Sequence, residues 1–260
     1  TYDCLQALFQ RDSYDGLGGD LVSAAHYGPP NFNNAAWTGE FMLYGDGFAV
    51  ADVGTHEFVH GVTTRTANMV YQNEPGALNE AWSDIMAAVC SYHSTGVMNA
   101  DTWTMGEDLP IPAIRYLNNP TQDGISRDLY ADRYLGTQDE GGVHINSGIG
   151  NLAFYLLTNG GGHPRQLSLQ SVEGIGIENA AQIFYRALTT YMNQTTDFAG
   201  ARVATERAAA DLYGEGSDQA ISVSEAWYAV GVGGPAPERI EPDPEPGEPG
   251  GPDTGETPGE

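Results

Sequence analysis

The 260-residue sequence contains no lysine, and its ten basic residues are all arginine. Set against 35 acidic residues, they leave a formal net charge of −25 at pH 7. Charge of this sign and size opposes binding to nucleic acids and to anionic membranes, so we expect neither as a partner. It favours solubility, and it suggests salty surroundings in which ions screen the repulsion between carboxylates.

Long apolar runs are also lacking, and none could span a bilayer. The chain starts at Thr1 without a signal segment, which predicts that it begins inside a longer precursor. Near the other end, residues 233–260 consist mainly of proline, glycine and acidic residues. Such a segment cannot offset its ordering entropy by burial, so we expect a disordered acidic linker there.

Cysteine is scarce, with Cys4 near the start and Cys90 in an apolar helical stretch. A disulfide between them is one alternative. The apolar surroundings of Cys90 favour a buried free thiol instead, and this is our expectation.

The most informative motif is His56-Glu57-Phe58-Val59-His60. Histidines at i and i+4 lie on one face of a helix, one turn apart, so both imidazoles can reach one metal ion. The glutamate between them points aside, where it can take a proton from a metal-bound water. The alternative is a surface helix that carries two unrelated histidines.

A third ligand is expected about twenty residues later, because a catalytic zinc takes three protein ligands and keeps one open position. Glu80 and Asp84 are themselves i and i+4, so both can face the first helix. One carboxylate can bind the metal while the other accepts the remaining ring N–H of a ligand histidine. Alternatively, Glu80 is a solvated acid on a helix surface.

These motifs are part of a longer pattern that resembles the thermolysin-like neutral metallopeptidases. The resemblance runs over about residues 1–232. It rests on Asn-Asn-Ala-Ala-Trp at 33–37, Tyr-Gly-Asp-Gly at 44–47, Tyr-Gln-Asn-Glu at 71–74, Asn-Glu-Ala-Trp-Ser-Asp at 79–84, Gly-Thr-Gln-Asp at 136–139 and Gly-Val-His-Ile-Asn-Ser-Gly at 142–148.

The family resemblance implies an α+β fold of the two-lobed zincin type. We expect a truncated N-terminal lobe at 1–68 that ends in the metal helix, a helical C-terminal lobe at 69–232, and the linker at 233–260. Most of the family's β-rich N-terminal lobe is missing, and the link between Gly47 and Asp52 is short. An opened cleft should therefore bind extended substrates weakly.

By resemblance, the zinc ligands are His56, His60 and Glu80, and the residues that support them are Asp84 and Asn79. Glu57 is expected to act as general base on a zinc-activated water.

The same resemblance assigns the residues around the reacting peptide. Tyr71 and His144 would stabilise the developing oxyanion, with Asp139 orienting the imidazole. Each has a structural alternative: Tyr71 could pack in the core, and His144 could merely open a helix.

Substrate binding is assigned to six further residues. Asn34 and the Ala35 backbone would hold an extended peptide, and Arg115 would contact a substrate carbonyl unless it only pairs with an acid. The pocket for the residue after the scissile bond would be lined by Val53, Leu109 and Ile114. An apolar pocket predicts cleavage before bulky hydrophobic residues.

Calcium is a weaker expectation. Asp52 and Glu107 match positions of the family's calcium cluster, but residues 91, 102 and 104 are Ser or Thr where acids are expected. Calcium needs six to eight oxygens, so we expect no double site and at most a single ion.

Apolar periodicity predicts helices over residues 2–10, 52–67, 74–92, 145–158, 177–191, 198–213 and 222–230, and strands over 21–26 and 40–44.

The sequence thus predicts a secreted, monomeric zinc endopeptidase that acts on peptides or proteins. The alternatives are an inactive fragment or peptide-binding module that retains the zinc site and, less favoured, a zinc aminopeptidase, for which the sequence shows no acidic motif that would read a free amine.

Overall fold

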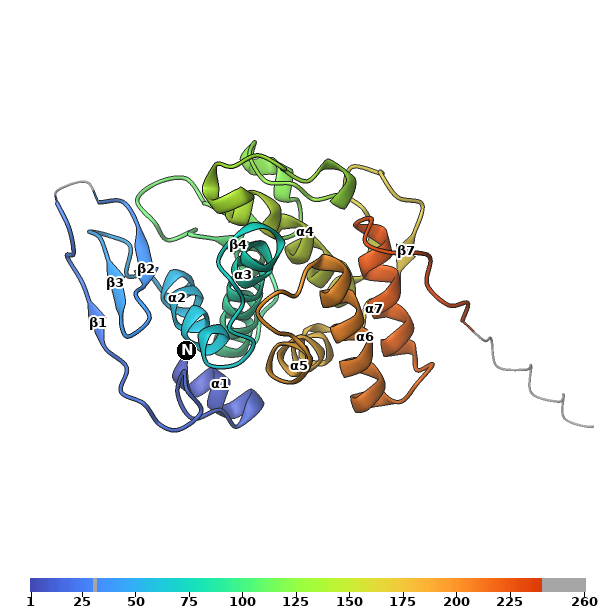
Figure 1. The fold of residues 1–260 in the computed structure, drawn as a ribbon, viewed down its shortest axis with the longest axis horizontal. Coiled ribbons are helices and arrows are strands. Elements are labelled where there is room, and N and C mark those ends of the chain that lie inside the picture. Colours follow the sequence, from blue (N-terminus) through green and yellow to red (C-terminus); the bar gives the residue numbers. More distant parts are fainter. Residues whose placement is uncertain (30–31, 240–260) are drawn as a thin grey trace, which may run out of the picture.

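The structure is a computed structural model that describes residues 1–29 and 32–239. Its N-terminal part contains a helix, α1 (Tyr2–Phe9), and a small sheet of β1 (Ser23–Ala24), β2 (Ala35–Trp37) and β3 (Met42–Tyr44). The strand order is β1-β3-β2, with β1 parallel and β2 antiparallel to β3. Strand β2 therefore lies at an edge of the sheet, next to helix α2 (Ala51–Thr64) (Figure 1).

The remainder is mainly helical. Its principal helices are α3 (Asn73–Thr95), α4 (Asp139–Asn159), α5 (Ile177–Arg186), which continues as the π-helical turn η4 (Ala187–Tyr191), α6 (Phe198–Tyr213) and α7 (Asp218–Ala229). Short elements connect them: η1 (Asp101–Trp103), β4 (Thr104–Met105), β5 (Arg115–Tyr116), η2 (Pro120–Asp123), η3 (Tyr130–Asp132), β6 (Gly161–Gly162) and β7 (Ser171–Val172).

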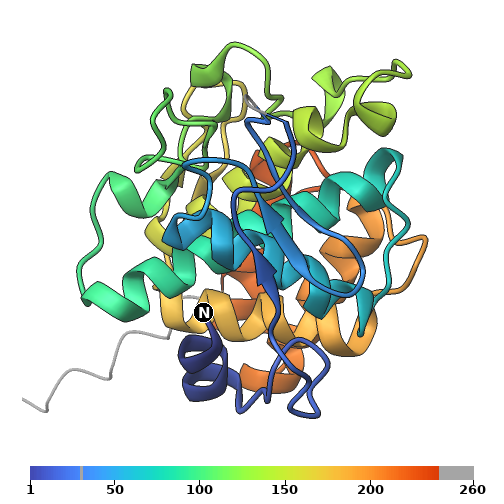
Figure 2. The same cartoon turned by 90° about the vertical axis from the view of Figure 1, so that its left-hand side faces the viewer.

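Helix α3 lies at the centre, between α2 and the C-terminal helices (Figures 1 and 2). Its middle is enclosed on all sides: Leu78, Trp82 and Ile85 have no exposed surface. The Trp82 indole donates a hydrogen bond to the Phe184 carbonyl of α5, which satisfies its polar atom inside the core. A helix this deeply buried holds its functional side chains in fixed positions.

Helix α4 begins with an irregular turn that the sequence did not predict. Asp139, Glu140, Gly141 and Gly142 all have positive φ, and regular helix follows from residue 143. The two glycines adopt this conformation without a Cβ clash. The predicted start at residue 145 therefore missed the turn that brings Asp139 next to the helix.

Other predicted elements differ mainly at their ends. Helix α6 has the predicted bounds, α2 stops at Thr64, and α7 begins at Asp218. The short strand β2 was not predicted. Residues 240–260 of the predicted linker lie outside the described residues, whereas Arg239 donates hydrogen bonds to Glu225 of α7. None of the described helices is both long and apolar enough to cross a membrane.

The expectation of a free thiol at Cys90 was wrong. Cys4 and Cys90 form a disulfide with their Cα atoms 5.7 Å apart. Helix α1 packs against α3, which places Cys4 beside Cys90 although 86 residues separate them in sequence. The apolar surroundings of Cys90 reflect this packing and hold a buried disulfide.

Candidate zinc site and active-site cleft

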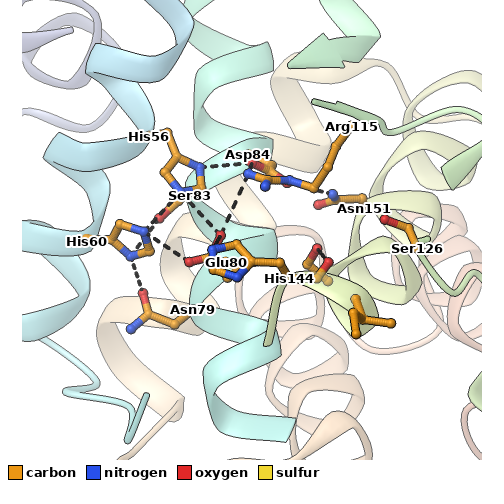
Figure 3. Close-up of polar contacts among 12 residues, drawn as sticks. His56, His60, Asn79, Glu80, Ser83, Asp84, Arg115, Ser126, His144 and Asn151 are labelled. Carbon is orange, nitrogen blue, oxygen red and sulfur yellow. Dashed lines mark hydrogen bonds and ion pairs between the residues drawn. The ribbon is translucent and has the colours of Figure 1, made fainter. Parts of the chain in front are cut away.

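Three side chains from α2 and α3 converge on one point, as Figure 3 shows. The Nε2 atoms of His56 and His60 lie 2.9 Å apart, and each lies 3.3 Å from an oxygen of Glu80. Glu80 is 1% exposed, and its Oε2 has no hydrogen-bond partner among the described residues. A buried, unsatisfied carboxylate oxygen beside two imidazoles fits a cation, and two histidines with one carboxylate form a ligand set of catalytic zinc.

The two histidine rings are oriented by hydrogen bonds from their other nitrogens. His56 Nδ1 donates to Asp84 Oδ1 at 2.8 Å, and His60 Nδ1 donates to Asn79 Oδ1 at 2.9 Å. A neutral ring that donates from Nδ1 presents a lone pair at Nε2, toward the other ligands. Asp84 and Asn79 thus lie where a supporting role requires them.

Asp84 is completely buried and neutralised by several partners. Arg115 donates to both its oxygens at 2.7 and 2.6 Å, and Asn151 Nδ2 donates at 2.8 Å. Burial alone would raise the pKa of Asp84, but the Arg115 guanidinium and the His56 hydrogen bond hold it well below the usual range. Arg115 therefore pairs with an acid, and it also lines the cleft.

Electrostatics at the ligands also favour a cation. Burial would lower the pKa of His56, but the carboxylates of Glu80 and Asp84 outweigh it and raise that pKa to about 10. Burial likewise opposes ionisation of Glu80, yet the histidines at positions 56, 144 and 60 hold its pKa well below the usual range. The site therefore stabilises positive charge at its centre.

Glu57 and the predicted oxyanion residues face the same cavity as the ligands. Glu57 is 6% exposed. His144 Nδ1 donates to Asp139 Oδ1 at 2.6 Å, and its Nε2 lies 3.2 Å from the Tyr71 hydroxyl. That hydroxyl donates to Glu80 Oε1 at 2.5 Å. Burial and the Glu80 charge raise the pKa of Tyr71, so its hydroxyl remains a donor at neutral pH.

The irregular first turn of α4 explains how Asp139 reaches His144. Asp139 Oδ2 also accepts a hydrogen bond from the His144 backbone N–H at 2.8 Å. One carboxylate therefore fixes both the start of the regular helix and the orientation of the imidazole.

The cavity has a volume of about 660 Å³, and most of the residues predicted to bind substrate line it. Ala35 lines it from strand β2 and Asn34 from just before that strand, and Arg115, Val53 and Ile114 line it as well. Leu109 does not: it is buried beside Gly106 and is not among the lining residues. Phe48 and Met105, which the sequence reading did not select, contribute apolar lining instead.

Sequence reasoning also missed two polar residues of the site. Asn151 lies seven residues after His144, two turns along the same face of α4, and this spacing was the available signal. Ser83, whose Oγ lies 3.3 Å from His60 Nδ1, is next to Asp84 in sequence and carried no such signal.

Asp52 and Glu107, the residues predicted for a single calcium ion, come near one another. Asp52 accepts a hydrogen bond from the Gly106 N–H. Partial burial raises the pKa of Glu107 to about 7, and the Asp52 carboxylate adds to the shift. Among the described residues, no third histidine, cysteine or acid joins them in a group of the kind formed by His56, His60 and Glu80.

Comparisons with known proteins agree with this geometry. A family model described as thermolysin metallopeptidase, catalytic domain, matches residues 1–64, and one described as thermolysin metallopeptidase, alpha-helical domain, matches residues 67–232. The chain is 46% identical over 245 residues to neutral protease B of Bacillus subtilis (strain 168). It is 45% identical over 245 residues to a thermolysin of Alicyclobacillus acidocaldarius subsp. acidocaldarius.

Each of these two alignments covers 89% of the chain and 43% of the relative, so the chain spans less than half the relatives' length. Among solved structures, the precursor of protealysin, a metalloproteinase from Serratia proteamaculans, is similar with a TM-score of 0.73 and 32% identity. That match covers 89% of this chain and 75% of the other. It confirms the predicted α+β fold of the zincin type.

Proposed function

The chain belongs to the thermolysin family of metallopeptidases, and from that premise we propose that it is a zinc-dependent endopeptidase. One observation carries the proposal: the ligand set His56, His60 and Glu80 opens onto the same cavity as Glu57, Tyr71 and His144. A metal-dependent hydrolase needs a metal site, a base and oxyanion donors within reach of one scissile bond, and the side chains that line this cavity are suited to those three roles.

His56, His60 and Glu80 would hold the zinc ion. When bound, zinc would act as a Lewis acid that acidifies water and polarises a peptide carbonyl. Glu57 takes the proton of the attacking water and returns it to the leaving amine. The Tyr71 hydroxyl, released from Glu80 when that carboxylate binds zinc, and the imidazolium form of His144 through its Nε2, 3.2 Å away, would donate to the developing oxyanion, while Asp139 holds the ring in position.

We propose that the substrate backbone binds along the unpaired edge of β2. Within residues 1–29 and 32–239, strand β2 pairs only with β3, and residues 34–39 line the cavity. An extended peptide can add to such an edge by main-chain hydrogen bonds, which give affinity with little sequence preference. Arg115 would contact a substrate carbonyl, because its bonds to Asp84 use only Nε and Nη2.

We also propose a preference for a bulky hydrophobic residue after the scissile bond. Val53, Ile114, Phe48 and Met105 supply the apolar part of the cavity lining. In such a pocket, each additional methylene group of the substrate that is buried strengthens transition-state binding by about 1 to 3 kcal/mol.

Secretion and a monomeric state are further proposals. The Cys4–Cys90 disulfide supports secretion, since disulfides persist in oxidising compartments. The net charge of −25 opposes self-association.

The deciding experiment uses a blocked, internally quenched peptide with leucine after the expected cleavage site. The zinc-loaded parent should hydrolyse it, and Glu57→Gln should reduce kcat by at least about a hundredfold while binding the same amount of zinc. Glu215→Gln makes the same chemical change in an exposed loop, and it should retain full activity. A parent that binds one zinc ion but leaves the peptide intact would contradict the proposal and indicate a peptide-binding module.

A further inference from the structure

One charged residue that lines the cavity, Asp123, has no role in the proposed zinc site and does not bind any residue that has one. The charged or titratable side chains lining the cavity are Glu57, His56, His60, Tyr71, Glu80, Arg115, His144 and Asp123. All but Asp123 are ligands or have the roles proposed above. Asp123 forms no ion pair with any residue in the described part of the chain. An acid that lines a substrate cavity and has no cation as partner is available to a substrate cation.

The Asp123 carboxylate is held in place by its own turn. Oδ1 accepts the backbone N–H groups of Ile125 and Ser126, each at 2.7 Å, and Oδ2 accepts the Ser126 hydroxyl at 2.6 Å. Ser126 is 3% exposed, so the turn is anchored in the protein. The carboxylate therefore loses little side-chain entropy when it pairs with another charge.

The turn that contains Asp123 lies on the side of the site away from the zinc ligand His60. Ser126 lies on the opposite side of Glu80 from His60, beyond Arg115 (Figure 3). Arg115, the arginine that lines the cavity, is already bound by both oxygens of Asp84. Asp123 is therefore the acid on the part of the wall that it forms with Ile125 and Ser126, whereas residues 34–39 line the cavity without a charged side chain.

We propose that Asp123 is a specificity-determining residue that selects peptides with a basic side chain beside the bulky hydrophobic one. The inference rests on the proposed endopeptidase function and names its substrate class. The net charge of −25 acts in the same direction, because it steers cationic peptides toward the protein at low salt. Asp123 adds a local attraction for a basic side chain of the bound peptide, which an acid far from the cavity cannot supply.

The test compares three quenched peptides that share leucine after the scissile bond and carry arginine, glutamine or glutamate at both flanking positions. For the zinc-loaded parent, kcat/KM should fall in the order arginine, glutamine, glutamate. Asp123→Asn retains the Oδ1 acceptor of the turn, and it should reduce the arginine-to-glutamate ratio by about two- to tenfold. Its kcat/KM for the glutamine peptide should change little.

The matched control is Asp15→Asn. Oδ1 of Asp15 accepts the N–H groups of Leu17 and Gly19 in a similar turn outside the cavity lining. The change in net charge is identical, so this variant should keep the parent's ratio. An equal ratio in parent and Asp123→Asn, or a parent without charge preference, would overturn the inference.

A binding experiment separates this inference from the proposed function. The same three peptides, labelled but unquenched, are titrated against Glu57→Gln and against Glu57→Gln combined with Asp123→Asn, with fluorescence anisotropy as the readout. Tighter binding of the arginine peptide that disappears in the double variant supports the role of Asp123 even if no hydrolysis occurs. Equal affinities in the two proteins contradict it, whatever the parent's activity.

Discussion

The carboxylate of Asp84 connects the ligand histidine His56 to a buried cation, Arg115. Both charges are enclosed: Asp84 is 0% and Arg115 is 8% exposed. Removing one member of such a pair leaves the other charge buried without compensation, which costs much more than the pair itself contributes. At this single residue, zinc affinity and folding stability are therefore coupled.

Asp84→Asn tests that coupling. The variant keeps the shape of the side chain but removes the main charge partner of Arg115, whose Nη2 then has only a Glu80 oxygen at 3.7 Å, so we expect a loss of about 3 to 5 kcal/mol in the free energy of unfolding. Zinc affinity should fall by about 10- to 100-fold, because the support of His56 is weakened. Urea unfolding and competition with a chromophoric chelator measure the two effects. Asn151→Ala removes one neutral donor from the same buried carboxylate, and it should cost about 1.5 to 3 kcal/mol. Zinc affinity within threefold of the parent in Asp84→Asn would refute the coupling.

At the residue scale, the local part of the site could be predicted from the sequence. His56 with His60 and Glu80 with Asp84 are pairs at i and i+4, so helix geometry alone places each pair on one face. The partners that depend on tertiary packing could not be found in this way. The pairing of Asp84 with Arg115, 31 residues away, and the position of Asp123 follow from loop paths that no local periodicity encodes.

Between elements, the contact of α1 with α3 is fixed by the Cys4–Cys90 disulfide. The bond closes a long loop that includes the sheet and the metal helix α2. Closing a loop of this length restricts the unfolded chain strongly, by the loop-entropy argument.

Replacing both cysteines by serine should lower the free energy of unfolding by about 2 to 5 kcal/mol, because the unfolded chain regains that freedom. Neither cysteine lines the cavity that contains the proposed zinc ligands, so zinc stoichiometry at low temperature should be unchanged. Thermal unfolding of the parent with and without reductant provides the control: reductant should lower the midpoint of the parent and leave that of the double variant unchanged. Equal midpoints for the oxidised parent and the double variant would disprove the stabilising role.

A second contact between elements joins α2 to the loop after β4 through Asp52 and Glu107. Glu107 has a pKa of about 7 in the folded protein and an ordinary value near 4.5 when unfolded. Between these values the folded state binds more protons than the unfolded state, so stability from this group falls as pH rises. Above about pH 7 the full repulsion between the two carboxylates is present.

Glu107→Gln should therefore stabilise the protein at pH 8 and make no difference below about pH 4.5. The gain should be less than about 1 kcal/mol, because Glu107 is exposed on one side and solvent screens the repulsion. The midpoint of thermal unfolding, followed from pH 5 to pH 8, measures the slope. Millimolar calcium should raise the parent's midpoint at pH 8 if an ion binds to both carboxylates, and it should have no effect on the variant. A variant less stable than the parent at pH 8 would contradict the sign of this argument.

The elements themselves were predictable where the pattern was long. Helix α6 has sixteen residues with a regular apolar spacing, and its predicted bounds were correct. Strand β2 has only three residues, too few for an alternating pattern, and it was missed although Asn34 and Ala35 were assigned to substrate. The turn that opens α4 has left-handed residues, which periodicity does not reveal.

For the whole molecule, the balance of charge decides how stability depends on salt. Ten arginines face 35 acidic residues, and several arginines form ion pairs at the surface, such as Arg186 with Asp211 and Arg165 with Asp132. Salt weakens such exposed pairs, and each contributes at most about 1 kcal/mol. Salt also screens the repulsion within the surplus of 25 negative charges, which acts over the entire surface.

Because the surplus charges outnumber the pairs, we expect sodium chloride to stabilise the folded protein. The midpoint of thermal unfolding at pH 8 should rise steadily between about 0.05 and 1 M salt, over which the Debye length falls from more than 10 Å to about 3 Å. The same series near pH 5, close to the isoelectric point of about 4.2, is the internal control. Carboxylates begin to protonate there, so the salt effect should shrink. A midpoint that is highest at low salt and pH 8 would mean that the ion pairs dominate, and the expectation of saline surroundings would then be wrong.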